Sequence, residues 1–362
     1  MTQTTTSTVV TSTPHPPGKV LRCGVVGVGR MGQHHARVYA TQPGSTLVGI
    51  VDASPERRGA IADKFDTRAL ASVDELIDAG VDAVSVAVPT VHHQAVAEKL
   101  LRAGVACLVE KPLAKDVQSA QAIKDLADST GSVLMVGHIE RFNPVMRAMQ
   151  RAVETGQAVV PRYIEVSRVS PMTFRSVDIG VVMDMMIHDI DVVLMLMDGR
   201  EPDEVQAAGV PVITEHEDIC NARLTWNADP ATGRKPCVAN ISASRLALKT
   251  ERITRITGEN AYIKIDYGNK NGTMIRRIAN EIQMREMREQ LRGGADLTSL
   301  KWQELVNIEN LTVDDAEPIV TEINEFLDAV RSGRRPAIDA QAGFVNVRTA
   351  QRIVAAIAQS MN

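Results

Sequence analysis

Short apolar runs alternate with stretches of helical spacing over the first third of the chain. The apolar runs cover residues 21–26, 46–51, 83–88, 105–109 and 133–136. Strands that helices cover on both faces are apolar throughout, and strand–helix alternation with short connections indicates right-handed βαβ units. We therefore predict an α/β domain over residues 21–140, with a doubly wound parallel sheet of the Rossmann type.

The pattern changes after residue 140. A helical stretch at 181–197 is followed by five runs of strand composition between residues 204 and 265, with no helix between them. Such a succession is typical of an antiparallel sheet. We predict an α+β domain over residues 141–362 that contains an open, mostly antiparallel sheet. The amphipathic helices at 318–331 and 342–361 are expected to pack back on the body. Residues 1–20, rich in Thr, Ser and Pro, are expected to be disordered.

A glycine fingerprint follows the first predicted strand. Gly27-x-Gly29-x-x-Gly32 lies between an apolar run and a helical stretch, and Arg30 and Met31 complete the turn. Asp52 ends the second strand, where an acid binds the ribose of NAD. The fingerprint predicts NAD as the cofactor, bound at the helix N-terminus. Arg57 and Arg58 leave NADP as an alternative, because basic residues there can hold a 2′-phosphate.

Composition limits the partners. The net charge of the 362 residues is −4 and aromatic residues make up 3%, so neither nucleic acid nor a membrane surface is an expected partner. The four cysteines show no close pairing, which favours reduced thiols and a cytoplasmic protein. No cluster of metal-ligand residues stands out in the sequence, and we expect no metal.

Two loops at the carboxyl ends of predicted strands carry candidate chemistry. In Glu110-Lys111-Pro112, the lysine can hydrogen-bond a substrate hydroxyl and stabilise the forming alkoxide. A solvent-exposed lysine or a contact with the pyrophosphate is the alternative reading. In the other loop, Pro89, Thr90 and His92 or His93 can contact the nicotinamide half, or Thr90 can simply cap a helix.

The apolar helix at 181–197 carries a polar stripe. Asp184, His188 and Asp191 are spaced i, i+4 and i+7, so in an α-helix they share one face. An active-site cavity would explain the stripe, with His188 as general base and Asp184 orienting it or contacting the sugar. A core histidine with an acidic partner is the alternative.

Polar residues beyond residue 140 suggest an anionic substrate. Arg141 and Asn143 follow the last of the apolar runs, at 133–136, and Arg168 and Arg175 flank a loop with a proline. Arginines that line a cleft suit phosphate or carboxylate groups. Most surface arginines have no such role, and each of these can equally be one of them.

The chain resembles the glucose–fructose oxidoreductase/inositol dehydrogenase family from about residue 21 to residue 360. The matching motifs are Gly27-Val28-Gly29-Arg30-Met31-Gly32, Val86-Ala87-Val88-Pro89-Thr90 with His92, Glu110-Lys111-Pro112-Leu113-Ala114 and Asp184-x-x-x-His188-x-x-Asp191. The resemblance implies that Lys111, Asp184 and His188 lie around the nicotinamide and the oxidised carbon. It also implies a Rossmann domain joined to an open-sheet domain, with homodimers or homotetramers formed through that sheet.

Two further stretches narrow the resemblance. Residues 137–144 and 168–181 look like those of members that oxidise the 3-hydroxyl of UDP-N-acetylglucosamine. The implied function is NAD-dependent oxidation of a secondary hydroxyl on a sugar nucleotide, giving a 3-keto sugar. An inositol, polyol or sugar dehydrogenase is the alternative within enzymes. A non-catalytic, dinucleotide-dependent sensor or regulator is the alternative of another class, because fold does not decide function.

Overall fold

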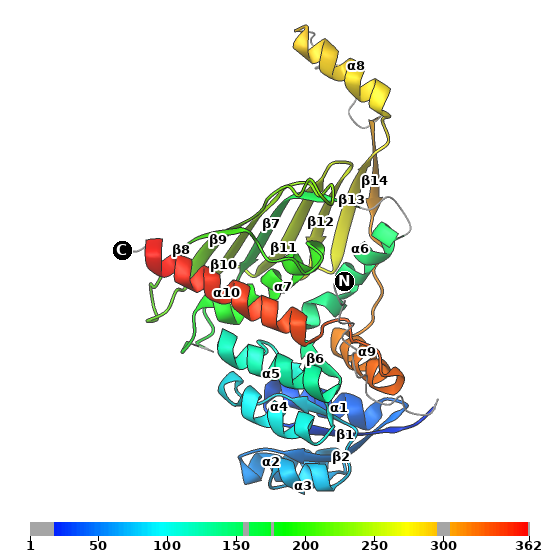
Figure 1. The fold of residues 1–362 in the computed structure, drawn as a ribbon, viewed down its shortest axis with the longest axis vertical. Helices are drawn as coiled ribbons and strands as arrows, with labels where there is room; N and C mark the ends of the chain where they lie inside the picture. The colour runs from blue at the N-terminus through cyan, green and yellow to red at the C-terminus, as the bar shows by residue number, and fades with distance from the viewer. Residues whose placement is uncertain (1–17, 155–158, 175–176, 295–304, 361–362) are drawn as a thin grey trace, which may run out of the picture. The chain divides into compact units, whose positions relative to one another are not determined.

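The computed structural model describes residues 18–154, 159–174, 177–294 and 305–360, and the chain divides into two compact units (Figure 1). The first unit runs to Phe142 and also takes Ile190–Glu201 and Ala316–Ala355. The second comprises Asn143–Asp189, Pro202–Asp315 and the chain beyond Ala355. The units are therefore discontinuous in sequence, whereas the sequence analysis places a single boundary near residue 140. Most of the tail expected to be disordered lies outside the described residues.

The first unit is built on a parallel sheet of six strands in the order β3-β2-β1-β4-β5-β6. Every neighbouring pair in it is parallel, which confirms the doubly wound prediction. The short edge strand β3 was not predicted, because two of its three residues are exposed and give no apolar signal. The strands are β1 (Leu21–Val26), β2 (Ser45–Val51), β3 (Arg68–Leu70), β4 (Ala83–Val86), β5 (Ala106–Glu110) and β6 (Leu134–Gly137).

Helices connect these strands, and α2, α3 and α5 each begin at a side-chain cap. Ser54, Ser72 and Asp116 each accept a backbone N–H of the first turn of the helix that follows. Late in the chain, α9 returns to pack against α1 and η2. The helices of this unit are α1 (Arg30–Thr41), α2 (Pro55–Lys64), α3 (Val73–Asp78), η1 (Thr90–His92), α4 (His93–Arg102), α5 (Val117–Thr130), η2 (Ile139–Phe142), α9 (Pro318–Ser332) and most of α10 (Ala340–Ser360).

The second unit contains a sheet of eight strands in the order β14-β13-β12-β11-β7-β10-β9-β8. Only β7 and β10 pair in parallel among these described strands, which confirms an open, mostly antiparallel sheet. The strands are β7 (Pro161–Val169), β8 (Glu204–Val210), β9 (Ile219–Trp226), β10 (Cys237–Ser244), β11 (Glu251–Gly258), β12 (Ala261–Asp266), β13 (Asn271–Arg277) and β14 (Val306–Asn310). Its helices are α6 (Pro144–Glu154), η3 (Val182–Met186) and α8 (Glu281–Arg292).

One face of this sheet is covered and the other is open. Along β9 and β10 buried and more exposed residues alternate, as the two-residue period of a strand requires. Ala222, Leu224 and Trp226 turn inward and are fully buried. The opposite face carries Glu165, Arg223 and other polar side chains, and is hollowed by about 650 Å³.

The helix predicted over residues 181–197 has two parts. It begins as the π-helical turn η3 and continues as α7 (Ile187–Leu196). The wider π turn changes the angular offset of Asp184 from the residues that follow it, so a stripe drawn with α-helical spacing does not hold across it. Among the described residues no helix is both long and apolar enough to cross a membrane.

Candidate functional site

The glycine fingerprint forms a tight turn between β1 and α1. Gly27 has φ +87°, a backbone conformation that side chains disfavour. A Cβ added to Gly32 would lie 1.8 Å from the Gly27 carbonyl oxygen, so only glycine lets α1 start this close to the turn. A Cβ on Gly29 would meet nothing within 4 Å. Gly27 and Gly32 therefore lie where a side chain would not fit, whereas the space beside Gly29 is open.

The open side of the turn suits a phosphate. Gly29 is the N-cap of α1 and contributes no side-chain cap, which leaves the first N–H groups of the helix available to a ligand. Beside it lies a hollow of about 630 Å³ whose lining includes the cations Arg30, Arg37, Arg57 and Lys64. Positive side chains and a helix N-terminus together fit the pyrophosphate and ribose of a dinucleotide.

Asp52 ties the end of β2 to this turn. Its carboxylate is nearly buried and accepts the backbone N–H of Val28 and of Ser54, both at 2.9 Å. Arg57 lies 3.5 Å from the same carboxylate, and Arg58 donates to the Asp52 carbonyl oxygen at 2.9 Å. Asp52 thus has a structural role that the sequence did not predict, beside the ribose contact that it did.

The Glu110-Lys111-Pro112 corner rests on a buried hydrogen bond. Nε2 of His35, on α1, lies 2.8 Å from Oε1 of Glu110, and the Lys111 N–H donates to Oε2 at 3.3 Å. Burial raises the pKa of the Glu110 carboxyl, but the hydrogen bond with His35 and the charge of Lys111 outweigh it and lower the pKa overall. Glu110 is therefore held ionised one residue before the candidate lysine, which is itself partly buried.

The loop after β4 is fixed by His93, for which the sequence predicts a contact with the nicotinamide half. His93 is buried, and its two ring nitrogens each lie 3.0 Å from a carbonyl oxygen, one of Val88 and one of Pro112. Burial lowers the pKa of His93. The imidazole thus joins the loop that holds Pro89 and Thr90 to the Glu110-Lys111-Pro112 corner, whereas the neighbouring His92 is exposed. Thr90 begins η1 and does not cap α4.

The predicted polar stripe divides into different environments. Asp184 in η3 and His188 in the first turn of α7 are partly buried. Asp191 is 1% exposed and accepts two hydrogen bonds from Arg141, at 2.6 and 2.7 Å. The third member of the stripe is thus half of a buried ion pair.

Two of the candidate substrate arginines are held by acids. Besides the Arg141–Asp191 pair, Arg168 donates to both oxygens of Asp189 at 2.7 and 2.8 Å, and this pair is almost fully buried. A substrate phosphate would have to compete with a carboxylate for either guanidinium group. Asn143 accepts the Val145 N–H at the start of α6. Arg175 lies outside the described residues.

His138, directly after β6, is a further buried residue that the sequence analysis did not select. It is 1% exposed, and neither ring nitrogen has a hydrogen-bond partner among the described residues. Burial lowers its pKa, with the charges of Asp191 and Arg141 acting in opposite directions. Its position after a strand of the parallel sheet is the signal that would have found it.

Comparison with known proteins identifies the family. Residues 21–138 match the description "Oxidoreductase family, NAD-binding Rossmann fold", and residues 173–362 match "Oxidoreductase family, C-terminal alpha/beta domain". The chain belongs to this oxidoreductase family. The first match spans the glycine turn, Asp52 and the Glu110-Lys111-Pro112 corner, so the family supplies the cofactor, NAD, that the geometry of the turn fits. The family resemblance drawn from the sequence motifs is confirmed.

Proteins to which the chain is similar include dehydrogenases. UDP-N-acetylglucosamine 3-dehydrogenase of Acidithiobacillus ferrooxidans is 36% identical over 89% of this chain and 93% of its own. A solved structure of that enzyme covers 93% of this chain and 97% of its own, with a TM-score of 0.79. Inositol 2-dehydrogenase of Rhizobium meliloti is 30% identical over 53% of this chain and 59% of its own. The chain is thus a dehydrogenase of the NAD type that acts on CH–OH groups.

Replacing Asp52 with alanine is expected to weaken NAD binding at least about tenfold, since a hydrogen bond to a charged group contributes roughly 1.5–3 kcal/mol. Stability should fall as well, because the Val28 and Ser54 N–H groups lose their acceptor. Asp63→Ala, at an exposed position on α2, is the matched control. The dissociation constant of NAD and the thermal midpoint are the measurements. An unchanged dissociation constant would mean that the ribose is held elsewhere.

Proposed function

We propose that this protein oxidises the 3-hydroxyl of UDP-N-acetylglucosamine to a 3-keto sugar nucleotide, with NAD as the oxidant. One observation carries the proposal: the similarity to the Acidithiobacillus ferrooxidans enzyme extends over nearly the whole of both chains. The inositol dehydrogenases match over only about half of this chain. Similarity that includes the second unit is the kind that bears on substrate choice, because the Rossmann half is shared by the whole family.

The residue roles in this proposal follow the family resemblance. Lys111 polarises the oxygen of the reacting hydroxyl, and His188 accepts its proton, with Asp184 orienting the imidazole or binding the sugar. NAD supplies the acceptor for the hydride that leaves the C3 carbon. The ionised Glu110 beside Lys111 and the carbonyl contacts of His93 favour a fixed position for the lysine's backbone.

Cofactor contacts are assigned to the turn and the two loops. In the proposal, Arg30 and Met31 flank the pyrophosphate, and Pro89, Thr90 and His92 meet the nicotinamide half. Arg141, Asn143, Arg168 and Arg175 are retained as candidate substrate residues. For Arg141 and Arg168 the role is to shape and charge-balance the site rather than to grip phosphate directly, because each already binds a carboxylate.

A polyol dehydrogenase is the second candidate. The ion pairs of Arg141 and Arg168 favour it to a degree, since they remove two free cations that a sugar nucleotide would use. A neutral polyol needs neither. The discriminating property is therefore the requirement for the nucleotide moiety, which the assay below tests directly.

We also propose a cytoplasmic homodimer or homotetramer formed through the open face of the sheet in the second unit. That face carries both signs of charge, including Glu165, Arg223 and Arg255, so two copies related by a two-fold axis can pair opposite charges. The four cysteines are free and buried, which suits a reducing compartment.

The proposed activity predicts NADH formation when the purified protein meets NAD and UDP-N-acetylglucosamine, with hydroxylamine present to trap the ketone as an oxime. Absorbance of NADH is the measurement, and free N-acetylglucosamine and myo-inositol are the matched substrates. Turnover confined to the sugar nucleotide is the expected result. Turnover with inositol instead would select the polyol dehydrogenase, and NAD binding without turnover of any of the three would select a sensor.

Lys111→Ala is expected to lower kcat about 10²- to 10³-fold, as the loss of a donor to a developing oxyanion does. NAD affinity should stay within a few-fold, because the turn and Asp52 are untouched. Lys115→Ala, an exposed lysine four residues later, is the control and should leave both quantities unchanged. Equal losses of turnover and NAD binding in Lys111→Ala would assign the lysine to the cofactor instead.

A further inference from the structure

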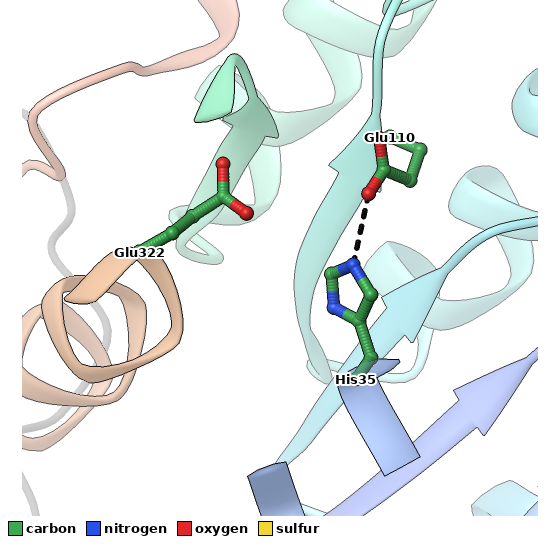
Figure 2. A group of neighbouring side chains, drawn as sticks. All are labelled: His35, Glu110 and Glu322. Carbon is green, nitrogen blue, oxygen red and sulfur yellow. Dashed lines mark hydrogen bonds and ion pairs between the residues drawn. The ribbon is translucent and has the colours of Figure 1, made fainter. Parts of the chain in front are cut away.

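Three buried ionisable side chains, His35, Glu110 and Glu322, meet in the first unit. They come from α1, the end of β5 and α9, and Figure 2 shows the Glu322 carboxyl group directed toward His35 and Glu110. One ligand atom of each lies within 4.8 Å of the other two. His35 and Glu322 are fully buried and Glu110 is 9% exposed. Only the His35–Glu110 bond is accounted for by the mechanism above.

Glu322 is the unusual member of this group. Both of its carboxyl oxygens are buried, and neither has a hydrogen-bond partner among the described residues. An isolated ionised carboxylate in such a place is strongly disfavoured, and the group takes a proton instead. Burial, and then the charge of Glu110, raise the pKa of Glu322 well above its usual range. A carboxylic acid, unlike a carboxylate, has a proton to donate.

The hydrogen bonds around His35 have one consistent direction when the imidazole is neutral. Tyr39 O–H donates to Ser85 Oγ at 2.7 Å, Ser85 donates to His35 Nδ1 at 2.9 Å, and His35 Nε2–H donates to Glu110 at 2.8 Å. This chain ends on the carboxylate that accepts the Lys111 N–H. It needs a single negative charge, on Glu110, and a second charge on Glu322 would repel it.

We infer that Glu322 is a positioning residue for Lys111: it stands as a neutral carboxylic acid beside the Glu110 carboxylate and adds no second charge there, so that the His35 bond fixes Glu110 and, through it, the Lys111 backbone. Glu322 touches neither substrate nor cofactor in this role and acts through Glu110. The effect on turnover rests on the function proposed above, whereas the protonation of Glu322 does not.

A divalent cation is the competing occupant of the cluster. Two carboxylates and an imidazole are a common ligand set for transition metals. Here, however, His35 and Glu110 are in direct contact at 2.8 Å, and a metal bound to both would displace the proton that they share. One proton on Glu322 balances the charge with no change in that contact.

Other ionisable groups on elements near Glu322 are already engaged or exposed. Those on α1 and η2, which pack against α9, are Arg30, His34, His35, Arg37, Tyr39, Glu140 and Arg141. Arg37 pairs with Glu317 and Arg141 pairs with Asp191. Tyr39 is bound to Ser85, and its own pKa is raised by burial first of all. Glu110 is thus the charged group that, after burial, raises the pKa of Glu322.

The test compares wild type with Glu322→Gln, which keeps size, neutrality and a donor. The infrared difference spectrum between the two at neutral pH should contain the C=O band of a protonated carboxylic acid. Asp328→Asn, at an exposed acid on the same helix, should remove carboxylate bands only. Metal content is measured on the same samples. A spectrum without the protonated band, or a stoichiometric divalent ion that Glu322→Gln loses, overturns the proposal.

Stability gives a second readout of the same proton. The native state keeps the Glu322 proton, whereas the unfolded chain releases it above a pKa of about 4.3. Rising pH therefore favours unfolding of wild type relative to Glu322→Gln, by up to about tenfold in the unfolding constant per pH unit until the native group ionises. Equal pH dependence of the two proteins in denaturant titrations would contradict a protonated Glu322.

Activity tests the positioning role. Glu322→Gln and Glu322→Leu, both neutral, should retain kcat within a few-fold, whereas Glu322→Lys, which places a cation beside Glu110 that competes with His35, should lower kcat about tenfold or more with the NAD dissociation constant unchanged. Equal kcat in the Gln and Lys variants would reduce Glu322 to packing. The infrared and stability measurements need no substrate. They therefore test the protonation of Glu322 independently of the proposed dehydrogenase function.

Discussion

Burial of a charge at the end of β5 is the constraint on which the cofactor side of this protein depends. Glu110 sits inside the first unit, and the His35 bond keeps it ionised there. Removing the His35 donor would leave the buried carboxylate without this partner, which costs roughly 1–3 kcal/mol and more for a charged group. His35 lies on the helix that begins at the glycine turn, so one bond links the phosphate end of the site to the corner that presents Lys111.

Buried charges are also paired among the candidate substrate residues. The Arg141–Asp191 and Arg168–Asp189 pairs each satisfy an arginine within its own unit. Arginines that are already paired keep their geometry in the absence of substrate, which suits a role in rigidity. Recognition of a uridine diphosphate would then depend on groups other than these two guanidinium side chains, or on a rearrangement of their bonds.

Local patterns in the sequence predicted the parts of this fold that are locally determined. The strands of the Rossmann sheet were predicted from apolar runs, and the turn at Gly27 from the spacing of the glycines. The structure gives the reason for that spacing, because a Cβ at Gly32 would clash with the Gly27 carbonyl oxygen. The edge strand β3 was not predicted from the sequence, because its exposed residues cannot be told from those of a loop. The π turn at η3 was not predicted either, because an apolar run contains no signal for an extra residue per turn.

Partnerships between distant residues were the other limit. His35 precedes Glu110 by 75 positions, and no spacing rule pairs them. Glu322 reads as an ordinary surface acid on an amphipathic helix until the helix is placed against α1. The candidates Lys111, His188 and Asp184 came from motifs, and what the structure adds is the support behind the first of them. The supporting residues differ from surface residues by the burial of their ionisable groups, and a sequence motif does not reveal that difference.

The most direct measurement of the central claim is the fate of a deuterium at C3 of UDP-N-acetylglucosamine. The labelled substrate is incubated with NAD and the protein, and the reduced cofactor is analysed by mass spectrometry and proton NMR. The account predicts that the deuterium appears at C4 of the reduced nicotinamide and that the sugar product is the 3-ketone. Reduced cofactor that carries no deuterium, with the label still on the sugar, would place the oxidation at another carbon and contradict the account.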